Sequence, residues 1–78
     1  MKLPLVDAKK LIKILVLKGY VQVRQSGGGS HLQFKNEKGI LITVPVHPGR
    51  DIGRGLLRKI IRDMELSRDE FIELLEEV

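Results

Sequence analysis

Residues 30–44, SHLQFKNEKGILITV, decide the fold of this chain, because they contain two strand patterns separated by a short turn. Apolar and polar side chains alternate in SHLQFKN, and an alternation with period two is typical of a strand with one buried face. GILITV is apolar and β-branched almost throughout, which also favours a strand. The intervening EKG is short and carries a glycine, so we expect the two strands to form an antiparallel hairpin.

One more strand pattern precedes this hairpin. YVQVRQ, residues 20–25, alternates and contains β-branched residues, and SGGG at residues 26–29 is short enough for a second hairpin turn. Three antiparallel strands in chain order are therefore expected. From the alternation we place Gln22 and Arg24, with Tyr20, on the face of the sheet that lies away from the core.

A helix is predicted before the strands. VDAKKLIKILVLKGY, residues 6–20, repeats apolar residues at the spacing of one buried helix face. Asp7 is a good N-cap, because its carboxylate can accept a hydrogen bond from a free backbone N–H of the first turn. Gly19 suits the C-terminal end, since glycine adopts positive φ without strain.

Two helical patterns follow the strands. Prolines and a glycine end the sheet, and IGRGLLRKIIRDM, residues 52–64, then predicts a helix with Asp51 as its N-cap. SRDEFIELLEEV, residues 67–78, opens with Ser67 and Glu70 at the spacing of a capping box and predicts a short third helix.

The order of elements is α-β-β-β-α with a short C-terminal helix. This order favours an α+β fold in which helices cover one face of a three-stranded antiparallel sheet. A chain of 78 residues suits one domain, which we assign to residues 1–78. There is no cysteine, which excludes disulfides and cysteine–metal sites. The first residues lack a long apolar run, so we expect no signal peptide, no membrane span and a cytoplasmic location.

Charge is distributed unevenly along the chain. Residues 1–62 contain 13 Lys and Arg against 3 Asp and Glu, whereas residues 63–78 contain 1 Arg against 7 acidic residues. A basic body of this kind favours a polyanionic partner, most often nucleic acid. Arg54, Arg58 and Arg62 recur at every fourth position and predict a basic stripe on the second helix. The acidic end is most simply a solvated helix face.

His31 is the candidate functional residue. Leu32 and Phe34 are the apolar pair of their strand, so His31 and Lys35 fall on the opposite, open face. A histidine there is either an inert surface residue or a group that meets a ligand. The glycines before it, residues 27–29, are either a plain turn or a segment whose backbone N–H groups can approach a phosphate closely.

A histidine on a basic face suits RNA cleavage by the RNA's own 2′-hydroxyl. That reaction needs a base that works near neutral pH, a role for which His31 is suited. It also needs cations or N–H donors to stabilise the charged phosphorane, and Arg24 or Lys35 would supply the positive charge. The reaction requires no metal, so we expect neither a metal site nor a cofactor.

The stretch GSHLQF, residues 29–34, resembles the G-S-H-x-x-F signature of the HicA-type mRNA interferase toxins. The second half of the chain resembles the same family, with a V-P-x-H stretch at residues 44–47 and G-x-L-R-K-I at residues 55–60. The glycine–aromatic pair at residues 19–20 matches a further family position. The resemblance extends from about residue 11 to residue 75.

This resemblance implies a fold like that of the double-stranded-RNA-binding domain. It also implies metal-independent cleavage of mRNA and a HicB-type antitoxin that covers the active site. The family's catalytic histidine matches His31, while His47 matches a second, less strictly kept family histidine. The residues expected to support His31 or to hold RNA are Gly29, Ser30, Arg24, Lys35, Arg54 and Arg58.

Two other functions fit the same residues. A non-catalytic RNA-binding module of the same fold would need basic helix and loop residues more than a histidine. A protein-interaction domain would use its basic face to bind an acidic antitoxin and nothing else. RNA cleavage in the presence of EDTA separates the enzyme from the binding module, and salt-sensitive RNA binding argues against the third reading.

Overall fold

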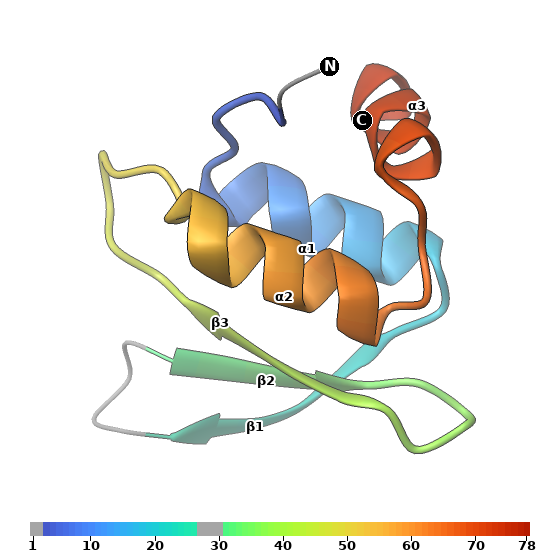
Figure 1. The fold of residues 1–78 in the computed structure, drawn as a ribbon. Coiled ribbons are helices and arrows are strands. Elements are labelled where there is room, and N and C mark those ends of the chain that lie inside the picture. Colours follow the sequence, from blue (N-terminus) through green and yellow to red (C-terminus); the bar gives the residue numbers. More distant parts are fainter. Residues whose placement is uncertain (1–2, 27–30) are drawn as a thin grey trace.

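The computed structural model describes residues 3–26 and 31–78. They form three helices and a three-stranded antiparallel sheet, which confirms the expected α+β class and order of elements. The elements, labelled in Figure 1, are α1 (Ala8–Leu17), β1 (Val21–Ser26), β2 (His31–Lys35), β3 (Leu41–Pro45), α2 (Arg54–Asp63) and α3 (Arg68–Glu77). None of the helices formed by the described residues is long and apolar enough to cross a membrane.

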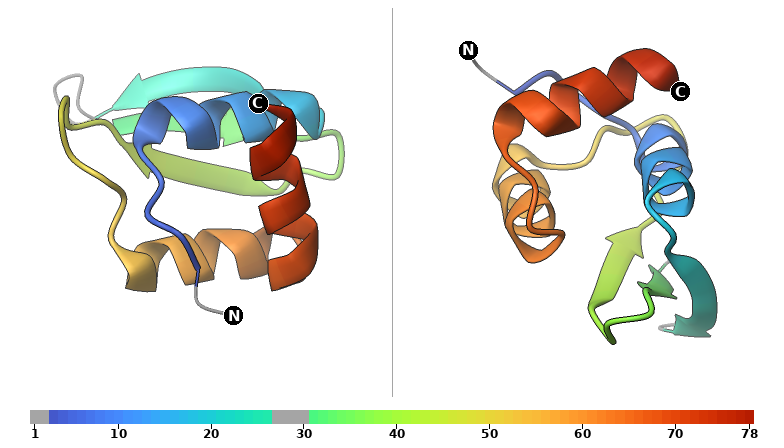
Figure 2. Two further views of the ribbon diagram at one scale, coloured as in Figure 1. Left: turned by 90° about the horizontal axis from the view of Figure 1, so that it is seen from above. Right: turned by 90° about the vertical axis from the view of Figure 1, so that its right-hand side faces the viewer.

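The helices lie on one side of the sheet. α1 and α2 cover one face, and α3 runs across these two helices on the side away from the sheet (Figures 1 and 2). The opposite face of the sheet is not covered by any of these helices. We call it the open face.

β2 is the central strand of the sheet, with β1 and β3 at its edges. β2 and β3 pair without interruption, from Lys35 opposite Leu41 to His31 opposite Pro45. The turn between them is held by Asn36, whose Oδ1 accepts hydrogen bonds from two backbone N–H groups of the same turn. His31 therefore lies at the end of the hairpin farthest from this turn.

β1 departs from regular alternation. Gln22 lies opposite Phe34 and Arg24 lies opposite Gln33, so the register shifts between these two positions of β1. Such a β-bulge adds one residue to one strand and exchanges the faces on which the following positions lie. The residues of β1 before and after the bulge therefore have opposite phases.

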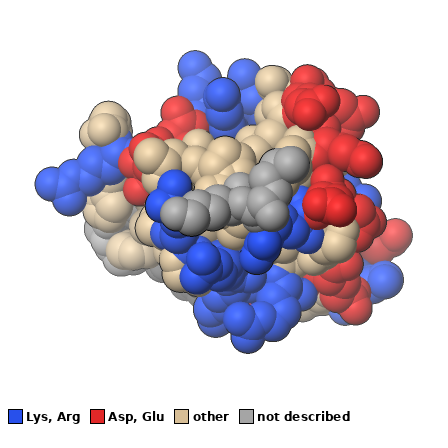
Figure 3. Space-filling model, turned by 45° about the horizontal axis from the view of Figure 1, so that its top comes forward, with Lys and Arg blue, Asp and Glu red and all other residues tan. Residues whose placement is uncertain are grey.

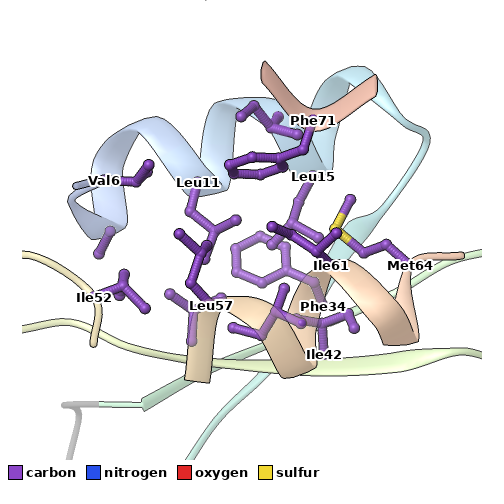
Figure 4. Packing of buried hydrophobic residues seen from close by; sticks show 14 of the residues in the cluster. Val6, Leu11, Leu15, Phe34, Ile42, Ile52, Leu57, Ile61, Met64 and Phe71 are labelled. Atoms are coloured by element: carbon purple, nitrogen blue, oxygen red, sulfur yellow. The ribbon is translucent and has the colours of Figure 1, made fainter. Parts of the chain in front are cut away.

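The core lies between the sheet and the helices (Figure 4). Phe34 and Ile42 from the covered face of the sheet pack beneath Leu57 and Ile61 of α2, and all four side chains are buried. Full burial of each such side chain stabilises the fold by about 1.5–3 kcal/mol. The core thus fixes which face of β2 is turned toward the helices.

α3 is joined to this core through Phe71, which is fully buried above Leu11 and Leu15 of α1 (Figure 4). Its first turn is closed by the expected capping box. The N–H of Glu70 donates to Ser67 Oγ at 3.1 Å, and the N–H of Ser67 donates to Glu70 Oε1 at 2.8 Å. The prediction of a third helix with this cap is confirmed.

The prediction that Asp51 caps the second helix is wrong. α2 begins at Arg54, and its N-cap is Gly53, which makes no side-chain capping bond. Asp51 instead lies in an isolated backbone bridge with Asp7. The next N–H, that of buried Ile52, donates to the Val6 carbonyl at 2.7 Å. Extended backbone beside the N-terminal segment therefore takes the place of the expected helical turn. Asp7 does cap α1, accepting from the N–H of Lys10 at 2.9 Å.

Candidate functional site

The side chains of β2 alternate between the two faces as the sequence predicts. Phe34 is buried in the core, and Leu32 packs against it. His31 and Gln33 are partly buried and Lys35 is exposed, all three on the open face. His31 therefore lies on the face of the sheet that the alternation predicts, and its candidate role depends on that placement.

The pairing of the strands arranges the open face in three rows. At one end, His31 stands between Ser26 of β1 and Pro45 of β3. In the middle, Gln33 stands between positions 24 and 43. At the other end, Lys35 stands between Val21 and Leu41. We name these the His31 row, the Gln33 row and the Lys35 row.

The sequence pattern places Gln22 and Tyr20 on the open face together with Arg24. This prediction is wrong for Gln22 and Tyr20, because β1 contains a bulge. Position 24 lies in the Gln33 row, next to the His31 row. Gln22 instead lies opposite Phe34, in the phase of the covered face. Tyr20 precedes the strand and is only 4% exposed, within the core. Its burial, helped by the negative charge of Glu65, raises the pKa of the Tyr20 phenol.

Lys35 does not reach toward His31. Its Cε lies 4.0 Å from the point where a Cβ would stand on Gly39, in the β2–β3 turn. The side chain therefore leans toward the turn, at the opposite end of the sheet from His31. Four residues of strand separate the two Cα atoms by about 13 Å. The geometry separates Lys35 from any reaction at His31.

Arg54 and Arg58 belong to α2, so the sheet lies between them and the open face. Both are exposed, as the predicted basic stripe requires. Arg58 and Arg62 line a hollow of about 240 Å³ together with Arg68, and buried Ile61 contributes to its wall. The basic residues are thus divided between the open face, where Lys35 lies, and the helical side of the sheet, where the arginines of α2 lie.

Charge is separated on the helical side of the molecule as well. Figure 3 shows acidic side chains gathered at one side of that view, near α3, with clusters of Lys and Arg beside them. The exposed acidic residues of α3 are Asp69, Glu70, Glu73, Glu76 and Glu77. An acidic helix surface repels polyanions, so it disfavours RNA binding on that part of the surface.

His47 is not brought onto the open face with His31. It is exposed and lines a hollow of about 230 Å³ with Asp7 and Lys9 from the start of α1 and with Arg50. Those partners lie on the helical side of the sheet. The second histidine of the sequence therefore occupies a different surface from the first.

The sequence pattern did not predict two exposed apolar side chains of the open face. Val21 is 64% exposed and Leu41 is 50% exposed, and they stand on either side of Lys35. The exposure of Leu41 could have been predicted from the sequence, because Leu41 alternates with Ile42 and Val44, which are buried. The exposure of Val21 could not, because the bulge in β1 interrupts the alternation.

Two of the expected site residues, Gly29 and Ser30, lie outside the described residues. Within the described ranges there is no group of three or more His, Asp or Glu side chains that could hold a metal ion. The candidate site that the structure does describe consists of His31 and its neighbours on the open face.

Among known proteins, no curated protein matches this chain. A family model described as the HicA toxin of bacterial toxin–antitoxin systems matches residues 8–66, which extend from the first residue of α1 to the connection between α2 and α3. The match covers all three strands and His31. The chain therefore belongs to the HicA family of bacterial toxins.

Proposed function

We propose that this toxin is a metal-independent endoribonuclease that cleaves mRNA on the open face, with His31 as the general base. The observation that carries the proposal is the placement of His31. It lies at the end of the central strand, on a face that none of the described helices covers, with its neighbours Leu32 and Phe34 turned to the core.

The proposed reaction uses the 2′-hydroxyl of the RNA as nucleophile. His31 takes the proton of that hydroxyl while the oxygen bonds to the adjacent phosphorus. The bond from phosphorus to the 5′-oxygen of the next nucleotide then breaks, and a proton reaches the departing oxygen. The products are a 2′,3′-cyclic phosphate and a 5′-hydroxyl, and neither a metal nor a redox step is involved.

Supporting roles follow from position in the sequence and in the sheet. Gly29 and Ser30 directly precede His31, and we assign them to positioning the histidine and the reacting phosphate. Arg24, one row away, is the candidate for the positive charge that stabilises the phosphorane. Lys35 leans away from that point, so we assign it to binding RNA and not to the reaction.

The family also bears on the partner. A toxin of a toxin–antitoxin system is controlled by an antitoxin. We propose a HicB-type protein that covers the open face and keeps RNA from His31. A cytoplasmic location is part of the same proposal, because mRNA is its substrate.

The test is cleavage of a mixed-sequence single-stranded RNA in EDTA by the wild type, His31→Ala and His47→Ala. We expect the wild type and His47→Ala to cut the RNA, and His31→Ala to lose cleavage by at least a hundredfold. Equal melting temperatures for wild type and His31→Ala would show that the fold is intact. Equal cleavage by these two proteins would exclude His31 as the base.

A non-catalytic RNA-binding module is the alternative, and the basic α2 surface is the observation that favours it. There, Arg58 and Arg62 stand on a face remote from His31. Under this alternative the RNA stays intact in EDTA, the wild type retains a gel shift, and Arg58→Ala weakens that shift more than His31→Ala does.

A further inference from the structure

The Lys35 row combines one cation with two exposed aliphatic side chains. Val21 is 64% exposed and Leu41 is 50% exposed, and the strand register places Lys35 between them. Lys35 itself is exposed, and its Cε lies beside the turn, 4.0 Å from the point where a Cβ would stand on Gly39. No ion pair of Lys35 is seen among the described residues, whereas Lys38 in the same turn is 3.7 Å from Glu65.

This combination matches the chemistry of a nucleotide. An ammonium group attracts a phosphate as a point charge. Exposed aliphatic groups gain stability when an apolar surface covers them, and a nucleobase offers such a surface on each face. A purely ionic ligand would leave Val21 and Leu41 in water, and a purely apolar ligand would leave the charge of Lys35 without a partner.

The position of the row on the strand sets its relation to the reaction. Lys35 lies about 13 Å from His31 along β2, a distance that roughly two nucleotides of an extended strand span. The side chain leans farther away, toward Gly39. A strand of RNA cut at His31 and laid along β2 therefore passes over the Lys35 row well beyond the scissile phosphate.

We propose that the Lys35 row is a binding subsite for an unpaired nucleotide about two positions from the bond that His31 cleaves. Lys35 holds the phosphate, and Val21 and Leu41 contact the base. The inference rests on the proposed function. It adds that the substrate is single-stranded at this position and long enough to reach from the His31 row to the Lys35 row.

The aliphatic pair is the reason for choosing an unpaired nucleotide. In a duplex the bases are stacked inside and the phosphates and sugars face the protein, so Val21 and Leu41 would meet polar groups. Bases of a single strand can turn toward the protein and cover apolar side chains. A double-stranded RNA of equal length is therefore expected to gain nothing from these two residues.

The experiment compares substrates of two lengths. Dinucleotides reach only the His31 row, whereas mixed-sequence single strands of about 12 nucleotides cover the whole face. With the long substrate we expect Lys35→Ala to raise KM five- to tenfold at unchanged kcat, and Leu41→Ser to raise KM by a similar factor. With dinucleotides neither variant is expected to change kcat/KM.

Two control variants separate this subsite from general effects. Lys13→Ala removes the same charge from the exposed side of α1, and Val16→Ser removes a side chain of similar exposure, 59%, from the same helix. Both are expected to match the wild type on both substrates. The subsite is excluded if Lys35→Ala behaves like Lys13→Ala, or if it lowers kcat on dinucleotides, which would place Lys35 at the reacting phosphate.

A binding measurement keeps the subsite distinct from the catalytic proposal. Fluorescence anisotropy of a labelled single strand with the His31→Ala protein, with and without Lys35→Ala, reports on the subsite even if the wild type cleaves nothing. Loss of binding with Lys35→Ala but not with Lys13→Ala supports the subsite. If Leu41→Ser instead changes the molecular mass in solution while RNA binding stays constant, the row is a contact between copies and the proposal fails.

Discussion

The side chain of Lys35 lies beside Gly39, with its Cε 4.0 Å from the position that a Cβ on that glycine would occupy. Gly39 has a φ of +85°, in the region that side-chain-bearing residues rarely adopt. Lys35 therefore lies next to a turn whose backbone conformation favours glycine. The effect of that conformation on stability can be tested by substituting Gly39 alone.

Gly39→Ala is expected to destabilise the protein by about 1–2 kcal/mol, because alanine is strained at positive φ. Gly55→Ala is the matched control. Gly55 lies in the first turn of α2 and a Cβ there meets no atom within 4 Å, so alanine should stabilise the protein by about 0.5–1 kcal/mol. Urea unfolding of the two variants gives both signs. A stabilised Gly39→Ala would contradict the backbone conformation of the turn.

Phe71→Ala should cost about 3–5 kcal/mol, the usual range for removing a fully buried phenylalanine. The net stability of a domain this small is of the same size, so the variant should be largely unfolded at 37 °C. Glu73→Ala changes an exposed residue of the same helix and should stay within about 0.5 kcal/mol of the wild type. Circular dichroism during heating compares the two. A cooperative transition in Phe71→Ala close to that of the wild type would show that α3 does not contribute to the core.

The capping box predicts a pH dependence of stability. Hydrogen bonds from Ser67 hold the pKa of the Glu70 carboxyl below its ordinary value of 4.5. A lowered folded-state pKa means that the ionised carboxylate stabilises the fold above the unfolded-state pKa, and that this contribution is lost as the pH falls through the folded-state pKa. Glu70→Gln should therefore melt below the wild type at pH 7, and the two should converge as the pH is lowered below 4.5. A gap that stays constant down to pH 3 would contradict the role of the charge.

The separation of the basic residues predicts different salt dependences. If RNA lies on the open face, Lys35→Ala should reduce the slope of log K against log salt concentration by about 0.7, the value for one phosphate of a single strand. Arg58→Ala should leave that slope unchanged, because α2 lies on the other side of the sheet. Anisotropy titrations between low and physiological salt measure both slopes. A slope reduced by Arg58→Ala and not by Lys35→Ala would move the RNA to the helical side and favour the non-catalytic alternative.

Much of the fold was predictable because its signals are local. The alternation of Leu32 and Phe34 with His31 and Lys35 correctly divided β2 between core and open face. The capping box beginning at Ser67 placed the start of α3, since both of its hydrogen bonds are made within one turn. The family resemblance read from the residues around His31 agrees with the family that the chain belongs to.

The errors arose where contacts distant in sequence override local preference. Asp51 has the chemistry of a helix cap, but the backbone bond from Ile52 to Val6 holds that segment extended. The bulge in β1 leaves no clear mark in the alternating sequence, so strict alternation places Tyr20 and Gln22 on the wrong face of the sheet. The lean of Lys35 toward the turn depends on rotamers, which sequence periodicity does not specify.

The central position of β2 has a consequence for motion. An edge strand has one hydrogen-bonded neighbour and leaves the backbone groups on its outer side unpaired in the sheet, whereas β2 is paired on both sides, so local opening of β2 requires both ladders to break. The strand that carries His31 is therefore expected to be the least mobile of the three. His31, which we propose as the general base, stands on this strand, so little of the binding energy would have to be used for ordering the protein around it.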